Sequence, residues 1–492
     1  MGSTELVAAV RRGDADAVRE LLEGGADPNA RDPADGVPPL CVAVAAYDEP
    51  VAGELIRAGA DPLRSPGGAP GGDPGLPGGD TALTRAVDGG CSWMVTALLP
   101  DLVHLDADAR ADLLARARYW AEADLETELR RRAGAAGPLE RGTVRVDPWY
   151  AHHERYSLGG QTVWDGHPGV LTVLEERFRI RTSFDELLAR ALTRPDRDHN
   201  VWSDSVCLLA GRLDEETWGA AQALSAHPDR LHRLFAADVL RCLVIGFGGL
   251  FSRPGSVVYK LAPEVFLPWA LEEPDPEVLA LVLSGLSEEG DSAGNGEIIE
   301  PVGLSYAGHP DPRVRLEVPD TLSREPARAR VPREKLDVLY TLARDPDPRV
   351  RERAARWLAH CPAEAPGITD VLAGLLGDEL RDTRVHAAYG LAQRDDPRCV
   401  AAERGLRPLD VDGGPDDGLL RAMWRYEERH PEARGPRLSE PKVSEPGVSE
   451  PGVSEPGVSE PKASDPGVSD PGVCEPGVCE PGVCEPRVAE PE

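Results

Sequence analysis

Most of the chain alternates between short amphipathic segments and polar turns. Apolar residues recur three and four positions apart, as in Leu6–Val10, in Val18–Leu22 and again in Val338–Leu342. This spacing places the apolar side chains on one face of a helix. Gly, Pro and Asp punctuate the segments at short intervals. The pattern predicts many short helices that pack in pairs. We find no run of 18 apolar residues, so we expect no membrane span.

A repeat of 34 residues occupies the first part of the chain. The sequence LLEGGADP at residues 21–28 returns as LIRAGADP at residues 55–62, and a third copy begins at Thr81. This pattern resembles the ankyrin repeat, which implies a turn, two antiparallel helices and a Gly-Ala-Asp loop. The resemblance covers residues 3–134 and is interrupted by a Gly/Pro-rich insertion at 65–79, for which we expect a mobile loop.

A second repeat, 36 residues long, lies downstream. The turn EPDPEV at residues 273–278 returns as HPDPRV at 309–314 and as DPDPRV at 345–350. An apolar helix with matched Val and Leu positions follows each turn. This pattern resembles the HEAT repeat in its short, phycobilisome-lyase-like form, over residues 185–430. The predicted fold class is therefore all-α: tandem α-solenoids, ankyrin then HEAT-like, followed by a disordered tail.

Several residues are expected to serve the repeats themselves. Gly25 and Gly59 follow a helix where a left-handed backbone is wanted. Asp311 and Asp347 precede a helix that starts with Pro, and their side chains can cap it. The resemblance to HEAT repeats also implies a ladder between neighbouring repeats, which we assign to these Asp residues with Arg313 and Arg349.

Residues 138–184 match neither repeat. Residues 143–146 and 161–164 could be short strands, and Gly159–Gly160 between them favours a small hairpin. The apolar spacing predicts a helix over 170–178. We expect this connector to join the two solenoids and to cover the first HEAT helix.

The tail at residues 438–492 repeats Ser-Glu-Pro-Gly-Val with a period of five. A proline in each repeat stops helix and sheet, and there is almost nothing to bury. The tail carries 12 acidic and 3 basic residues, which predicts an extended, self-repelling spacer. A multivalent ligand for a reader domain is the alternative.

Composition narrows the class of protein. Asp and Glu number 85 against 54 Lys and Arg, a net charge of −31, and such a field repels nucleic-acid backbones. Nine scattered Cys do not form a disulfide framework, and the first residues lack a secretory pattern, so we expect a cytoplasmic protein. The excess of Arg over Lys, with abundant Ala, Gly and Pro, suggests an actinobacterial genome.

The residues offer little catalytic chemistry. His152, His153 and His167 form a His-rich run in which Glu154 or Asp165 could help to bind a metal. Adjacent His side chains rarely share one ion, so we expect neither a metal nor a cofactor. Nucleophile motifs are absent. The alternative is an enzyme or enzyme accessory of the lyase-like HEAT group, acting on a tetrapyrrole or a protein; fold alone does not transfer that activity.

The sequence therefore predicts a non-enzymatic scaffold or adaptor that binds protein partners, and neither nucleic acid nor membrane. Stacked repeats form long surfaces suited to protein recognition. Ankyrin partners usually meet loop tips and inner helices, and in the HEAT part the positions after each turn are candidates. The predicted contacts are Arg11, Arg12, Tyr47, Asp48 and Trp93 in the ankyrin part, and Arg315, Arg351 and His386 in the HEAT part.

Overall fold

We analysed a computed structural model of the chain. One compact unit comprises Met1–Arg434, and Gly435–Glu492 form a second unit. The insertion at 65–79 and the tail at 438–492 lie outside the described residues. The structure describes residues 2–64, 81–99, 105–145, 152–245, 257–290, 296–322, 331–361, 365, 367–409 and 415–431. No helix in these ranges is long and apolar enough to cross a membrane.

Four helical pairs form the ankyrin part. Asp side chains cap several of these helices; Asp14, for example, accepts a hydrogen bond from the N–H of Ala17. Gly25 and Gly59 both adopt φ = 88°, as the loop after each pair requires. The pairs are α1 (Gly2–Arg12) with α2 (Ala15–Glu23), α3 (Pro39–Ala45) with α4 (Glu49–Arg57), α5 (Ala82–Gly89) with α6 (Ser92–Leu98), and α7 (Ala107–Glu122) with α8 (Leu125–Ala133).

Seven further pairs follow in the described part of the chain. Asp311 and Asp347 cap the second helix of their pairs, each accepting from a backbone N–H two residues on. The pairs are α10 (Phe184–Leu192) with α11 (Asn200–Arg212), α12 (Glu215–Ala223) with α13 (Arg230–Ile245), α14 (Val257–Glu272) with α15 (Pro276–Gly290), α16 (Gly296–Ser305) with α17 (Pro312–Thr321), α18 (Arg333–Leu342) with α19 (Pro348–His360), α20 (Ile368–Leu375) with α21 (Arg381–Gln393), and α22 (Arg398–Leu406) with α23 (Pro415–Arg429).

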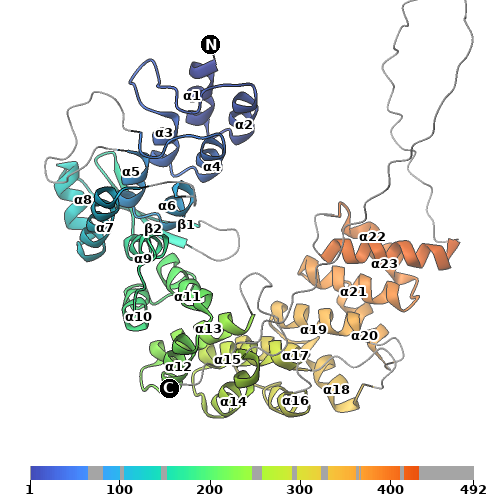
Figure 1. Ribbon diagram of the computed structural model, residues 1–492. Helices are drawn as coiled ribbons and strands as arrows, with labels where there is room; N and C mark the ends of the chain where they lie inside the picture. Colours follow the sequence, from blue (N-terminus) through green and yellow to red (C-terminus); the bar gives the residue numbers. More distant parts are fainter. Residues whose placement is uncertain are drawn as a thin grey trace, which may run out of the picture. The chain divides into compact units, whose positions relative to one another are not determined.

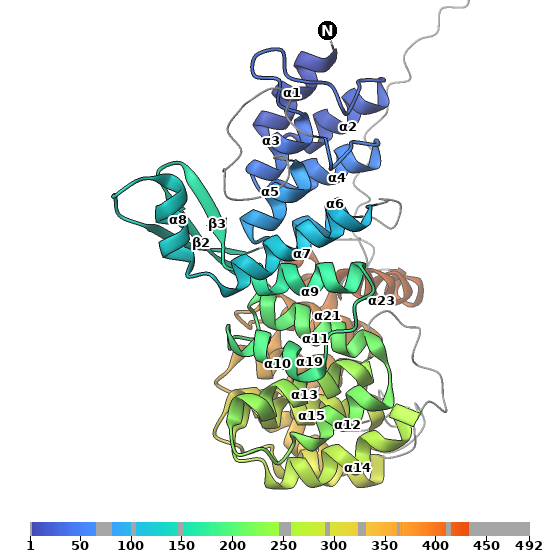
Figure 2. The ribbon, with the colours of Figure 1, turned by 60° about the vertical axis from the view of Figure 1, so that its left-hand side comes forward.

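The odd-numbered helices form one unbroken row from α1 to α23. Each of them packs against the next odd-numbered helix, including α7 on α9 (His167–Arg177) and α9 on α11. Figures 1 and 2 show these helices following one another from the ankyrin part into the HEAT part. In the first four pairs the helix of the row comes first, whereas in the seven later pairs it comes second. The single helix α9 stands between the two orders.

A three-stranded antiparallel sheet lies between α8 and α9 in the sequence, with the order β1-β2-β3. The strands are β1 (Glu140–Arg145), β2 (His152–Leu158) and β3 (Gln161–Trp164). The expected hairpin between residues 143–146 and 161–164 is therefore wrong, because β2 lies between these strands. Gly159 and Gly160, both at positive φ, make the turn from β2 to β3. The residues of β2 (HHERYSL) are mostly polar, so no apolar alternation marked this segment as a strand.

Helix α9 is buried on several sides. Val170 and Leu174 have no exposed surface, and the helix packs against α5, α6 and α7 of the ankyrin part and α10 and α11 of the HEAT part. Next to it, the side-chain amide of Asn200 at the start of α11 donates to the hydroxyl of Ser92 in α6, at 2.5 Å. Gly169 lies so close to the Asp204 carboxylate that a Cβ would collide with it. The two repeat types are thus packed together through α9.

We expect Leu174→Ala to destabilise the whole folded unit. The substitution removes a fully buried side chain and leaves a cavity, which costs about 2–5 kcal/mol of unfolding free energy. Urea denaturation followed by far-UV circular dichroism measures the change. The matched control is Leu271→Ala on α14, because that side chain is 66% exposed and its loss should cost about 0.5 kcal/mol or less. Equal midpoints for the two variants would contradict the role of α9.

Candidate functional site

The ankyrin residues predicted to contact a partner lie in two places. Arg11 is half exposed and pairs with Asp32 and Asp35 at 2.6 and 2.8 Å. Arg12 is more exposed and lies 3.9 Å from Asp14. The guanidinium of Arg12 is the more accessible of the two for a partner.

Tyr47 contacts the chain's own sheet. Its ring stacks on Trp164 of β3, with centroids 4.3 Å apart. Its hydroxyl lies within hydrogen-bond distance of the carbonyl oxygens of Gly89 and Thr162, at 3.1 and 3.2 Å. Burial raises the pKa of Tyr47 above its ordinary value. Asp48 caps α4, accepting from the N–H of Val51 at 3.2 Å. The turn between α3 and α4 therefore anchors the sheet to the ankyrin repeats.

Tyr47 and Trp93 line a pocket of about 430 Å³ between the ankyrin repeats and the sheet. One wall comes from the turn between α3 and α4, from the first turn of α4 and from Trp93 of α6. The other wall comes from all three strands. The complete lining is Ala45, Ala46, Tyr47, Glu49, Pro50, Trp93, Val144, Arg145, Arg155, Thr162 and Trp164. The sequence predicted partner contacts at Tyr47 and Trp93 on the ankyrin wall, but none on the strands that face them.

In the HEAT part, Arg315 and Arg351 form the ladder between repeats. Arg315 donates to both carboxylate oxygens of Asp345 in the next repeat, at 2.7 and 2.8 Å, and to the carbonyl oxygens of its own turn. Arg351 binds Asp378 in the same way, with the shorter contact at 2.6 Å. A protein partner would have to compete with these carboxylates.

The ladder thus lies two positions after the residues assigned to it. Arg313 pairs with Asp311 of its own turn and lies 3.2 Å from Glu277 of the preceding repeat. Arg349 is exposed, and its backbone N–H donates to Asp347. The first residue after the proline, Arg313 or Arg349, points outwards. The third residue after the proline, Arg315 or Arg351, lies about half a turn further round the helix and reaches the next repeat. His386 is nearly buried, with Nε2 3.3 Å from Glu352.

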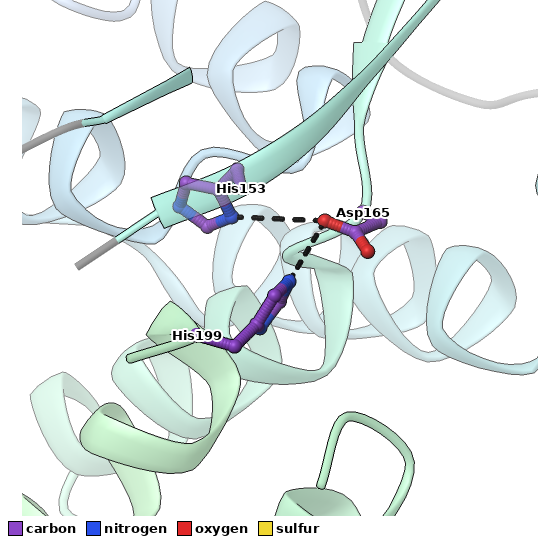
Figure 3. Close-up of side chains that lie close together, drawn as sticks. All are labelled: His153, Asp165 and His199. Carbon is purple, nitrogen blue, oxygen red and sulfur yellow. Dashed lines mark hydrogen bonds and ion pairs between the residues drawn. The ribbon is translucent and has the colours of Figure 1, made fainter. Parts of the chain in front are cut away.

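His153, Asp165 and His199 form a buried cluster where the sheet meets the start of α11 (Figure 3). His153 lies on β2, Asp165 follows β3, and His199 is the residue before α11. His199 Nε2 lies 2.9 Å and His153 Nδ1 4.0 Å from the same oxygen of Asp165. The three side chains are at most 4% exposed, so a substrate cannot reach them from solvent.

Hydrogen bonds satisfy Asp165 and His199, whereas both buried ring nitrogens of His153 lack a hydrogen-bond partner among the described residues. One Asp165 oxygen also accepts from the backbone N–H of Glu154, and the other accepts from Arg194 at 2.7 Å. Burial would raise the pKa of Asp165, but the bonds from His199, Arg194 and the Glu154 N–H outweigh it and hold the pKa well below its ordinary value. Asp165 is therefore an ionised carboxylate that ties the sheet to the residues before α11.

The donor arrangement at His199 fits a hydrogen bond to Asp165 better than a bond to a metal ion. The N–H of Val201 donates to Nδ1 of His199, so the proton of this imidazole lies on Nε2 and points at Asp165. A metal bound at Nε2 would force the proton onto Nδ1, against the Val201 N–H. Ligating histidines instead direct their second nitrogen at an acceptor. In this arrangement His199 does not fit as a metal ligand.

The other two histidines of the sequence motif point elsewhere. His167 donates from Nε2 to the carbonyl oxygen of Asp88 at 3.1 Å, and its ring stacks on Trp120. His152 Nε2 lies 3.5 Å from Asp196. Sequence reasoning named His153 and Asp165 together but missed His199. His199 is 34 positions beyond Asp165. Its position directly before an amphipathic helix is the one sequence signal for it, and that signal indicates a helix cap.

We expect Arg315→Ala to lower the unfolding free energy by about 2–4 kcal/mol, because it strands the nearly buried Asp345 carboxylate without its partner. The control is Arg349→Ala at an exposed position, with an expected loss of about 0.5 kcal/mol or less. Denaturant titration of both variants measures the difference. If Arg349 formed the ladder instead, Arg349→Ala would cause the larger loss of unfolding free energy.

We expect stability to fall as the pH drops from 7 to 5. Burial lowers the pKa of His153 to about 3 and that of His167 to about 4, whereas the unfolded chain binds protons at its ordinary histidine pKa. Between its folded and its unfolded pKa, each histidine therefore lowers the free energy of unfolding by about 1.4 kcal/mol for every unit by which the pH falls.

The pH dependence of the unfolding free energy tests this expectation. His153→Gln should reduce the slope by the share of one histidine, whatever it does to the stability at pH 7. His360→Gln, at an exposed position, is the matched control substitution. Parallel curves for His153→Gln and the parent chain would show that His153 does not titrate differently in the folded state.

Comparisons with known proteins agree with the helical pairs. The family described as ankyrin repeats (3 copies) matches residues 6–111, and the family described as HEAT repeats matches residues 336–402. The comparison with curated proteins gave no match. Pairs α10 to α17 precede the HEAT match and continue the same row of helices. The chain is therefore a repeat protein that carries ankyrin repeats in its first part and HEAT repeats in its later part.

Proposed function

We propose that this chain is a non-enzymatic, cytoplasmic scaffold that binds protein partners on its repeat surfaces. The observation that carries the proposal is the unbroken row of odd-numbered helices from α1 to α23. Ankyrin and HEAT repeats are general protein-interaction modules. A row that continues through both offers several repeat surfaces along one chain.

The polar groups of the described residues support a binding role. The buried cluster of His153, Asp165 and His199 is closed to solvent, and its hydrogen bonds hold the sheet and α11 together. Accessible chemistry lies instead on the surface, at Arg12 and at the pocket beside Trp93. We place the primary partner surface on the ankyrin part, with Arg11, Arg12, Tyr47, Asp48 and Trp93 at or near it. Arg315, Arg351 and His386 remain candidate contacts in the HEAT part.

The full chain as bait in a lysate of its source cells tests this function. We expect a protein partner in stoichiometric amount that also co-elutes with the purified chain in gel filtration. Arg12→Glu with Trp93→Ala should reduce the captured amount at least about ten-fold, which corresponds to 1.4 kcal/mol of binding free energy. The matched control is Arg404→Glu with Trp424→Ala, at exposed positions of α22 and α23. A chain that captures no protein in stoichiometric amount contradicts the scaffold.

A further inference from the structure

We propose that the pocket between the ankyrin repeats and the sheet binds an acidic segment of a partner protein, with a carboxylate of that segment held by Arg155 beside the Tyr47–Trp164 stack and Arg145 adding positive charge at the end of β1. This inference rests on the proposed scaffold function and names the chemistry of its partner. The pocket has an aromatic and apolar floor, two arginines on the sheet wall and one carboxylate, Glu49, on the ankyrin wall. Each of these features restricts what can fill it.

Both arginines are without side-chain partners among the described residues. Arg145 ends β1 and Arg155 lies in the middle of β2, and both side chains are exposed. Neither guanidinium has a hydrogen bond or ion pair with any residue in the described ranges. The chain has 85 acidic residues for 54 basic ones, and most described arginines are paired. Both residues line the pocket, and their guanidinium groups are free to bind an anion from another molecule.

Both arginines line the pocket, but they come from different positions of the sheet register. Arg155 pairs with Trp164 of β3, so both side chains lie on the face of the sheet that meets Tyr47. Arg145 pairs with His152, a position that alternates to the other face, and it lines the pocket as the last residue of β1. Guanidinium groups bind carboxylates through charge-assisted, often bidentate hydrogen bonds. The Tyr47–Trp164 stack beside them gives a flat surface for apolar parts of a ligand.

Glu49 selects a peptide over a simple anion. Burial raises the pKa of its carboxyl group, and Arg57 offsets this only in part. A free phosphate in the pocket would meet this carboxylate without offering it enough donors. A peptide carries both features: a side-chain carboxylate for the arginines and backbone N–H groups for Glu49. The net charge of −31 disfavours a long polyanion such as nucleic acid, whereas a short acidic segment needs only local compensation.

The test is selection of ligands from a random decapeptide phage library on the full chain, followed by fluorescence anisotropy with the selected peptides. We expect the selected peptides to carry Asp or Glu. Replacing that residue by Asn or Gln, or introducing Arg145→Glu with Arg155→Glu into the chain, should weaken binding at least about ten-fold. Binding should also weaken as sodium chloride is raised, because the contacts are ionic and exposed.

Two controls keep the outcome decisive. Arg404→Glu with Arg425→Glu makes the same charge change at exposed arginines of α22 and α23 and should leave peptide binding unchanged. Arg145→Gln with Arg155→Gln removes the charges without adding repulsion and replaces the Glu variant if that one does not fold. Thermal unfolding checks the fold of each variant.

The possible results separate this inference from the scaffold function. Selected peptides without acidic residues, or peptides that bind the Arg145→Glu, Arg155→Glu chain as tightly as the parent chain, overturn the inference. The same holds if no peptide is selected while the lysate still yields a stoichiometric partner, and in these cases the scaffold function stands. If neither peptide nor partner is recovered, both proposals fail.

Discussion

The burial of helix α9 between α7 and α11 is the packing on which the joined fold depends. Repeat arrays are stabilised by contacts between neighbours only, so one missing neighbour would separate the array into two. Helix α9 supplies that neighbour, with Val170 and Leu174 fully buried. Polar contacts stabilise the same region, because the Asp165 carboxylate accepts hydrogen bonds from His199 and Arg194 beside the first HEAT pair.

Single side chains also make several contacts at once within each repeat type. In the HEAT part an arginine such as Arg315 closes its own turn and binds the acid of the next repeat with one side chain. In the ankyrin part the turn residue Tyr47 binds not another repeat but the inserted sheet. The sheet is thereby fixed on one side by the ankyrin repeats and on the other by the residues before α11. This position turns an ankyrin surface into one wall of a pocket.

The sequence predicted what is local and periodic. The 34- and 36-residue periods indicated both repeat types, and Gly25 and Asp311 carried readable turn and cap chemistry. It failed where the decisive contacts are non-periodic and distant. Strand β2 has polar residues where an apolar alternation would show, and His199 meets Asp165 only after the sheet and α11 have packed. The arginine ladder was placed two positions early, because spacing identifies a motif but not the direction of each side chain.

The single helix α9 also sets the parity of the helical pairs in this chain. Ankyrin pairs place their row helix first and HEAT pairs place it second, so joining them directly would put two outer helices in succession. One intervening helix restores strict alternation along the whole chain. In this chain α9 thus supplies the row helix that neither α8 nor α10 provides. Deleting α9 would leave α8 and α10 next to each other in the sequence with no row helix between them.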